Sequence, residues 1–188
     1  GQDAGERLGG DPADYPCGFY WTEGTRGLGW AVNAVPTLKG GSSVGIPSQP
    51  AVRLPSGEIV TPGLVDAERL QGFDPDWTLP SVEVPGLRHS HRWKLVGNAV
   101  SVRMASWVGG RLSDPIEYDA AGETPLEPGD AWPSAAWGRN RQAFRVHTST
   151  WPVQYDYEDL SGFLEDTRLL SARATAGFLK RARMGNLR

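Results

Sequence analysis

The spacing of apolar residues predicts a short helix near the middle of the chain. Leu64, Ala67 and Leu70 follow one another at intervals of three, so a helix would carry them on one face. Thr61-Pro62 is a typical helix start, with threonine as the cap and proline at the first position, and Gly72 is a typical end. We therefore expect about two turns of helix between these signals.

A longer helix is predicted to begin at Gly97-Asn98, because asparagine is a good N-cap and apolar residues recur at helical spacing through Leu112. Two further helical segments are expected near the C-terminus, a short one over 159–164 and a longer one over 171–184. In the longer segment four residues are expected to face inward, namely Ala174, Phe178, Leu179 and Ala182, with arginines and a lysine outside.

Strands are expected in the first third of the chain. Residues 15–50 are almost uncharged and combine repeated glycines with an aromatic cluster, which is typical of short strands joined by glycine turns. A further strand is expected at Ile59-Val60, where apolar and polar residues alternate. Residues 113–138 are rich in proline, glycine and acids, and they predict a linker or long loop.

Composition narrows the fold class to a loop-rich α+β protein. Among 188 residues, 24 glycines and 15 prolines exclude a coiled coil or a compact helical bundle, while eight tryptophans are enough to anchor a core. No apolar stretch is long enough to span a membrane, and no secretory signal is visible. The chain does not begin with Met, which leaves open that it is a piece of a longer protein.

Charge is segregated along the chain. Residues 88–111 and 168–188 carry bases and no acids, and the stretch 113–138 between them carries six acids and no base. Two basic blocks suit a polyanionic partner. The alternative is that these charges are solvated helix faces, and composition does not decide between the two.

Isolated candidates for chemistry are weak. Cys17 with His147 as base would suit nucleophilic catalysis, but a buried small side chain explains the cysteine as well. His89 and His91 would share one side of a strand, yet a third metal ligand at convincing spacing is missing, so no metal is expected. The glycine-rich pairs complete no dinucleotide or phosphate-loop pattern.

Two stretches resemble a known family. Val60-Thr61-Pro62, followed by the run 66–73 (DAERLQGF) and Asp76-Trp77, is very similar to motif IX of DNA cytosine-5 methyltransferases. The run 94–102 (KLVGNAVSV), continuing through Trp107 to residue 112, resembles motif X of that family. Order and spacing match as well. Upstream, residues 35–40 (VPTLKG) resemble the end of the family's target-recognition region, and residues 171–178 are similar to a C-terminal extension of a bacterial branch.

The resemblance implies roles for individual residues. The family transfers a methyl group from S-adenosylmethionine to a flipped-out cytosine, and motif X closes the cofactor pocket. Three residues at the expected helix start are thus implied in cofactor binding, namely Asn98, Ala99 and Val100, through the Asn98 amide and free backbone N–H groups. The implied DNA-facing residues are Arg26, Thr37, Leu38, Lys39, Gly40 and Gly41, while Glu68 and Arg69 are implied to be scaffold.

The family's catalytic motifs are missing from this chain. The Phe-x-Gly-x-Gly of the cofactor site, the Pro-Cys-Gln with its nucleophile and the Glu-Asn-Val all normally precede the region seen here, and none is present. Pro16-Cys17 is followed by Gly18 instead of glutamine, so Cys17 does not match that nucleophile. The chain alone is therefore not expected to methylate DNA.

These observations predict that the chain is the C-terminal portion, or second subunit, of a bacterial DNA cytosine-5 methyltransferase. The chain itself is expected to lack most of the catalytic sheet. Its expected partners are double-stranded DNA and a catalytic subunit with the N-terminal motifs, in the cytoplasm at the nucleoid. Alternatives are a non-catalytic DNA-binding module, a gene remnant and, more remotely, a Cys17/His147 hydrolase. The expected segments are a polar tail (1–14), part of a recognition region (15–53), the motif IX and X region (54–112), an acidic linker (113–150) and a basic helical extension (151–188).

Overall fold

The computed structural model describes residues 11–22, 28–41, 49–133, 135–146 and 158–185. The chain divides into two compact units, residues 1–107 with 158–188 and residues 108–157, and each is described by itself. Helices and small antiparallel sheets occur together, which confirms the expected α+β class. Among the described residues, every helix is too short or too polar to cross a membrane.

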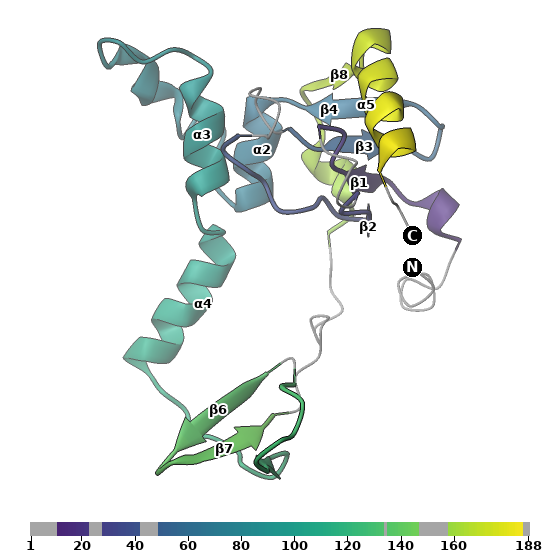
Figure 1. The fold of residues 1–188 in the computed structure, drawn as a ribbon. Helices are drawn as coiled ribbons and strands as arrows, with labels where there is room; N and C mark the ends of the chain where they lie inside the picture. Colours follow the sequence, from purple (N-terminus) through teal and green to yellow (C-terminus); the bar gives the residue numbers. More distant parts are fainter. Residues whose placement is uncertain (1–10, 23–27, 42–48, 134, 147–157, 186–188) are drawn as a thin grey trace. The chain divides into compact units, whose positions relative to one another are not determined.

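A five-stranded antiparallel sheet forms the centre of the first unit (Figure 1), in the order β2-β1-β3-β4-β8. Its strands are β1 (Cys17–Phe19), β2 (Ala31–Val32), β3 (Ala51–Arg53), β4 (Ile59–Pro62) and β8 (Thr167–Leu169). The edge strand β8 comes from far along the chain, since Thr61 pairs with Arg168. The expected strand at Ile59-Val60 is confirmed as part of β4.

Helices of the first unit lie both before and after residues 108–157 in the chain. They are α2 (Leu64–Gln71), α3 (His91–Asn98), the 102–107 part of α4 (Val102–Ser113) and α5 (Ala172–Met184), with short 3-10 turns η1 (Pro12–Asp14), η2 (Leu79–Glu83) and η3 (Leu160–Phe163). Two buried clusters form the core. Leu38, Ala67, Trp93 and Val96 make one, and Val52, Val60 and Leu160 make the other.

The helix predicted between residues 61 and 72 is confirmed, but it begins later than expected. Thr61 and Pro62 belong to strand β4, where they pair with β8, and Gly63 is the N-cap of α2. Sheet pairing therefore overrides the local start signal. The predicted end is correct, because Gly72 caps α2 in the left-handed conformation with φ of 86°.

The prediction that a helix begins at Asn98 is wrong. Asn98 is the last residue of α3, and Ala99 is extended, so that a second helix, α4, begins only at Val102. The side chain of Gln71 explains the break, since its Nε2 donates to the carbonyls of Val96 and Ala99, at 3.1 and 3.3 Å. This amide from α2 satisfies carbonyls that a continuing helix would have used itself.

The two C-terminal helical segments are confirmed as η3 and α5. Ser171 is the N-cap of α5 and accepts a hydrogen bond from the Ala174 N–H at 3.2 Å. Phe178 packs against Phe19 of β1, with ring centroids 5.5 Å apart. Leu179 differs from expectation, because 47% of it is exposed.

The second unit contains structure where we expected a linker or long loop. Strands β5 (Thr124–Leu126), β6 (Ala136–Arg139) and β7 (Gln142–Arg145) form a small antiparallel sheet in the order β5-β7-β6. Composition concealed this sheet, since its strands are short and carry only scattered apolar residues between prolines and acids. An aromatic group holds it together, with Trp137 lying 5.2 Å from Tyr118 and 5.9 Å from Phe144 between ring centroids.

Candidate functional site at the C-terminal end of α3

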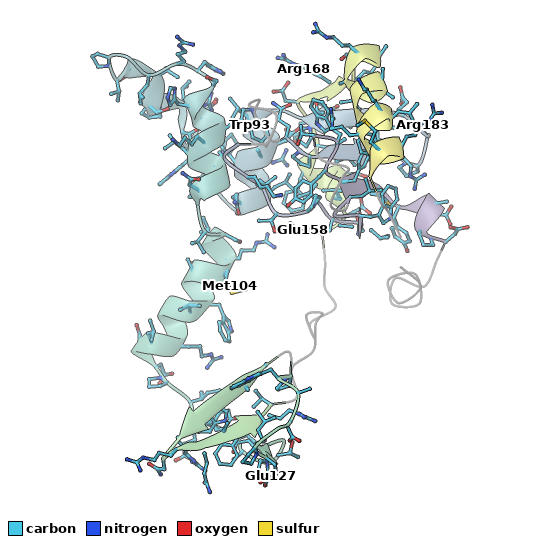
Figure 2. All side chains as sticks on the ribbon, in the orientation of Figure 1. Trp93, Met104, Glu127, Glu158, Arg168 and Arg183 are labelled. Carbon is cyan, nitrogen blue, oxygen red and sulfur yellow. The ribbon has the colours of Figure 1, made fainter. Side chains whose placement is uncertain are left out.

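The two stretches that resemble motifs IX and X fold against each other in the first unit. Motif IX contributes α2, and motif X contributes the end of α3 and the start of α4. Trp93 lies between α3 and α2 (Figure 2), in the buried cluster that also contains Ala67 and Val96. The Gln71 bonds to the end of α3 add a polar link between the same elements.

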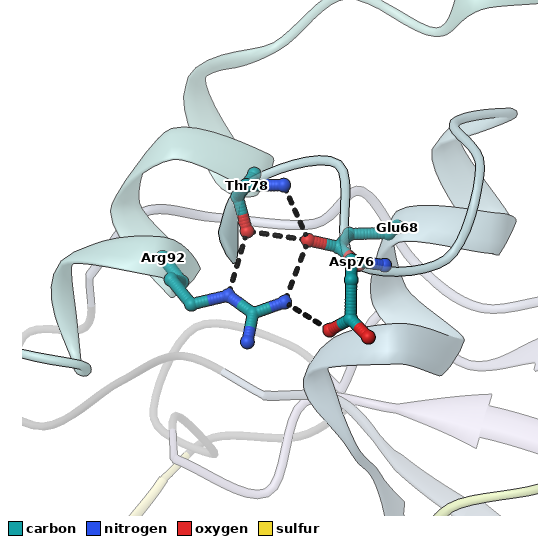
Figure 3. Close-up of polar contacts among 4 residues, drawn as sticks. All are labelled: Glu68, Asp76, Thr78 and Arg92. Carbon is teal, nitrogen blue, oxygen red and sulfur yellow. Dashed lines mark hydrogen bonds and ion pairs between the residues drawn. The ribbon is translucent and has the colours of Figure 1, made fainter. Parts of the chain in front are cut away.

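A buried ionic network fixes the loop between these helices (Figure 3). Arg92 of α3 lies 3.1 Å from the carboxylate of Glu68 and 2.9 Å from that of Asp76, measured from its Nη2 atom. Its Nε donates to the hydroxyl of Thr78 at 2.9 Å, and that hydroxyl donates to Glu68. Glu68 also accepts the backbone N–H groups of Asp76 and Thr78, at 2.7 and 2.9 Å.

This network gives Glu68 a structural position, because its side chain is fully buried and its polar partners lie on the α2–α3 connection and on α3. Arg92 is the partner that sequence reasoning missed. No local pattern marks this pairing, because α3 mixes polar and apolar residues and Glu68 lies 24 positions earlier in the chain. In the sequence Arg92 is one base of the block 88–111.

Two other α2 side chains hold the segment that leads into β8. Arg69 donates to the carbonyl of Gly162 at 2.8 Å and pairs with Glu165 at 2.8 Å. The fully buried carboxylate of Asp66 accepts the N–H groups of Glu165 and Asp166, at 2.9 and 3.1 Å. The motif IX helix thereby fastens residues about 100 positions away in the chain.

The end of α3 touches the segment expected to face DNA. A Cβ atom on Gly97 would overlap with the backbone of Lys39 and Gly40, so the two backbones lie in direct contact. A Cβ on Gly40 would lie 2.8 Å from Oδ1 of Asn98. The structure therefore brings together Gly40 and Asn98, which the resemblance had implied for DNA and for cofactor respectively.

The residues implied in cofactor binding differ in what they offer. Asn98 is exposed and its carboxamide borders Gly40. Val100 is 66% exposed. Ala99 does not have the free N–H group that we expected, because this group donates to the carbonyls of Leu95 and Val96 as the C-cap of α3. That expectation followed from the misplaced helix start and is wrong.

The residues implied in DNA binding are likewise not equivalent. Leu38 is buried in the core cluster with Trp93, so its side chain packs inside the first unit, and its part in DNA contact stays a prediction. The Lys39 Nζ atom lies 3.9 Å from the ring centroid of Tyr20, whose hydroxyl donates to the Thr37 carbonyl at 2.7 Å. Gly41 is exposed with open space around it. Arg26 lies outside the described residues.

The isolated candidates gain no support from their surroundings. Cys17 is fully buried, with its Sγ 3.5 Å from the carbonyls of Pro12 and Tyr15, and His147 lies outside the described residues. His89 and His91 are not on a strand as supposed, since His91 begins α3 and its Nδ1 accepts the Arg88 N–H at 3.0 Å. The described ranges contain no cluster of three metal-binding side chains.

A comparison with known proteins identifies a relative of this chain, which the geometry alone does not. The chain is 49% identical over 170 residues to the type II methyltransferase M2.BsuMI of Bacillus subtilis strain 168. The chain is similar to part of a bacterial methyltransferase. The aligned region covers 88% of this chain and 43% of that protein, so the chain spans less than half of its relative's length. No protein-family model and no solved structure matches the chain.

Proposed function

We propose that the chain is the C-terminal portion or second subunit of a bacterial DNA cytosine-5 methyltransferase. In this role it recognises the DNA target and closes the S-adenosylmethionine pocket, while a partner with the missing motifs supplies the catalytic cysteine. We assign the enzyme to restriction–modification, since the relative is named a type II methyltransferase. The observation that carries the proposal is the backbone contact between Lys39-Gly40 and Gly97, next to Asn98.

That contact suits an enzyme that must hold a DNA base and a cofactor close together. Methyl transfer to a flipped base requires both substrates in one pocket. Asn98 is the side chain that we assign to the cofactor, because its carboxamide is exposed and can both donate and accept hydrogen bonds. Val100 would add an apolar contact, and Ala99 drops out because its backbone groups are used in the cap.

Exposed apolar surface beside Asn98 suits the docking of the catalytic partner. Four large side chains along the end of α3 and the start of α4 are exposed, namely Leu95 at 45%, Val100 at 66%, Met104 at 57% and Trp107 at 60%. Phe73, Trp77 and Leu95 also line a mainly apolar groove of about 270 Å³ that reaches Ala99. Large exposed apolar patches mark interaction sites, and the fold seen here lacks the motifs that a complete enzyme needs.

Methyl incorporation into DNA from labelled S-adenosylmethionine tests the proposal. The chain is assayed alone and then mixed with the partner portion that carries the Pro-Cys-Gln motif, encoded upstream. Activity only in the mixture supports the proposal. Activity in neither case would contradict it and favour the DNA-binding or remnant alternatives, and activity of the chain alone would refute the assignment of catalysis to the partner.

Asn98→Ala tests the cofactor assignment in the same mixture. We expect a KM for S-adenosylmethionine raised by about tenfold or more, as one lost hydrogen bond to a charged ligand would give, with DNA affinity unchanged. Gln142→Ala is the matched control, because it removes another exposed carboxamide far along the chain. An unchanged KM for Asn98→Ala would remove Asn98 from the cofactor site.

A further inference from the structure

Helix α5 carries a row of positive charges that the functions assigned above do not use. Lys180 and Arg183 follow Arg173 by seven and ten residues in α5. At 100° per residue these offsets place the three side chains within an arc of about 80° around the helix. All three are exposed, and none forms a hydrogen bond or ion pair with the part of the chain that the structure describes. Ala176 lies between them on the same face and is also exposed.

The opposite face of α5 packs against the rest of the first unit, so the three basic side chains point away from it. Phe178 packs on Phe19, and the guanidinium of Arg181 donates to the carbonyl of Trp21 at 2.7 Å. Figure 2 labels Arg183 on α5 and Arg168 on the strand that precedes it. Arg168 is exposed as well, at the edge strand β8, but it is not part of the row on α5.

The stability of the helix does not explain this row. No acid occurs between residues 167 and 185, so α5 has none of the i, i+4 ion pairs that stabilise exposed helices. Basic residues in the last turn interact favourably with the helix dipole, and Arg183 is placed there. Arg173, however, lies in the first turn, where a positive charge is unfavourable.

We propose that this face of α5, formed by Arg173, Lys180 and Arg183, binds the phosphate backbone of double-stranded DNA. Three unpaired cations on one rigid face match a polyanion, and the small Ala176 lets the helix approach the backbone closely. Such contacts position a protein on the duplex without reading its sequence. The inference rests on the proposed function, which supplies DNA as the partner, and adds a binding surface outside the Lys39–Gly41 segment.

Salt-dependent binding to a labelled DNA duplex, measured by fluorescence anisotropy with the full chain, tests this inference. The slope of log affinity against log salt changes by about 0.9 for each phosphate contact. In the triple variant R173Q/K180Q/R183Q, we expect the slope to flatten by about 2.7. Between about 50 and 200 mM salt, the wild-type affinity should therefore fall about 40-fold more than that of the variant.

The matched control is R88Q/R139Q/R141Q, which removes the same charge from three exposed arginines elsewhere. The salt slope of this control should change by less than the value of about 0.9 that corresponds to one phosphate contact. Circular dichroism checks that both variants fold. An unchanged slope in the α5 variant, an equal loss in the control or no duplex binding by the wild type would each overturn the inference. Equally tight binding of polyglutamate would overturn DNA as the partner in favour of an acidic polypeptide.

Lys39→Gln separates this inference from the proposed function. A flatter slope only in Lys39→Gln would leave recognition by the 37–41 segment standing and overturn the role of α5. A flatter slope only in the α5 variant would support the inference and contradict that recognition role. The methyl-transfer assay reports on the catalytic proposal independently of both.

Discussion

The two units of this chain are stabilised in different ways. In the first, residues from distant parts of the sequence are buried together, including a complete ionic network around Glu68 and an edge strand that pairs Thr61 with Arg168. In the second, none of the residues that the structure describes is buried, and three strands within 124–145 are held by half-exposed aromatic side chains. The first unit is therefore specified by many partners, and the second mainly by local pairing.

This contrast indicates where each unit tolerates change. A buried charge with several partners cannot be removed without leaving another charge unpaired in the interior. Replacing a half-exposed aromatic side chain should lower the stability less, because water already reaches part of that side chain in the folded unit. The residues assigned to cofactor and DNA lie in the first unit, where a rigid surround can hold them in place.

Loss of Glu68 should produce the largest effect. In Glu68→Ala the buried guanidinium of Arg92 keeps only Asp76, which is more than half exposed, and Thr78. We expect the free energy of unfolding to fall by about 3–5 kcal/mol, measured by urea denaturation. Glu58→Ala, at an exposed turn, should change it by less than about 0.5 kcal/mol. Equal effects of the two substitutions would contradict the importance of burial in the first unit.

The contact between Gly97 and the Lys39-Gly40 backbone should be the next most sensitive feature. A methyl group in Gly97→Ala has no room, so we expect a loss of about 1–3 kcal/mol in unfolding free energy. Gly109→Ala in α4 is the matched control, because its Cβ would meet open space. Alanine there should stabilise the helix by about 0.5–1 kcal/mol. A neutral Gly97→Ala would mean that the two backbones do not touch.

A smaller effect, of opposite sign, is expected at the hairpin of the second unit. Asn140 and Arg141 both have positive φ, at 49° and 65°, in the two-residue turn between β6 and β7. A left-handed arginine is unfavourable by about 1–2 kcal/mol, and glycine is preferred there. Arg141→Gly should therefore stabilise the second unit by about 1 kcal/mol, measured by hydrogen exchange of β6 and β7 amides. Faster exchange would show that Arg141 makes a contact that the turn needs.

The smallest effect concerns the titration of Tyr118. Partial removal of its phenol from water raises the pKa of Tyr118, and the neighbouring carboxylate of Glu123 raises this pKa further. The neutral phenol is thus favoured in the folded unit, so its contribution to stability is present at neutral pH and is lost as the pH rises through the raised pKa.

Glu123→Gln should lower the pKa of Tyr118 toward its ordinary value. Ultraviolet absorbance titration, as the difference between each protein and its Tyr118→Phe counterpart, isolates this tyrosine from the others. Glu123 also accepts the Trp137 indole N–H, so amide exchange in β6 should become faster in the same variant. An unchanged Tyr118 pKa would mean that Glu123 does not lie beside the phenol.

Local patterns predicted several elements of this fold correctly. Apolar spacing identified α2 and α5, and the end signal at Gly72 is confirmed. Such features depend on residues only a few positions apart, which is the range over which helical periodicity and capping act. The resemblance to motifs IX and X also came from the sequence, and a methyltransferase relationship is supported by the Bacillus protein.

Only the tertiary structure decided the rest, because it depended on residues far apart in the chain. Thr61-Pro62 became strand through pairing with β8, and the break after Asn98 depends on Gln71 from another helix. The pairing of Arg92 with Glu68 and the contact of Gly40 with Gly97 join segments that no local pattern connects. The sequence by itself indicated α2, α5 and most of α4, but not α3. The long-range contacts determined where those segments end and which residues meet.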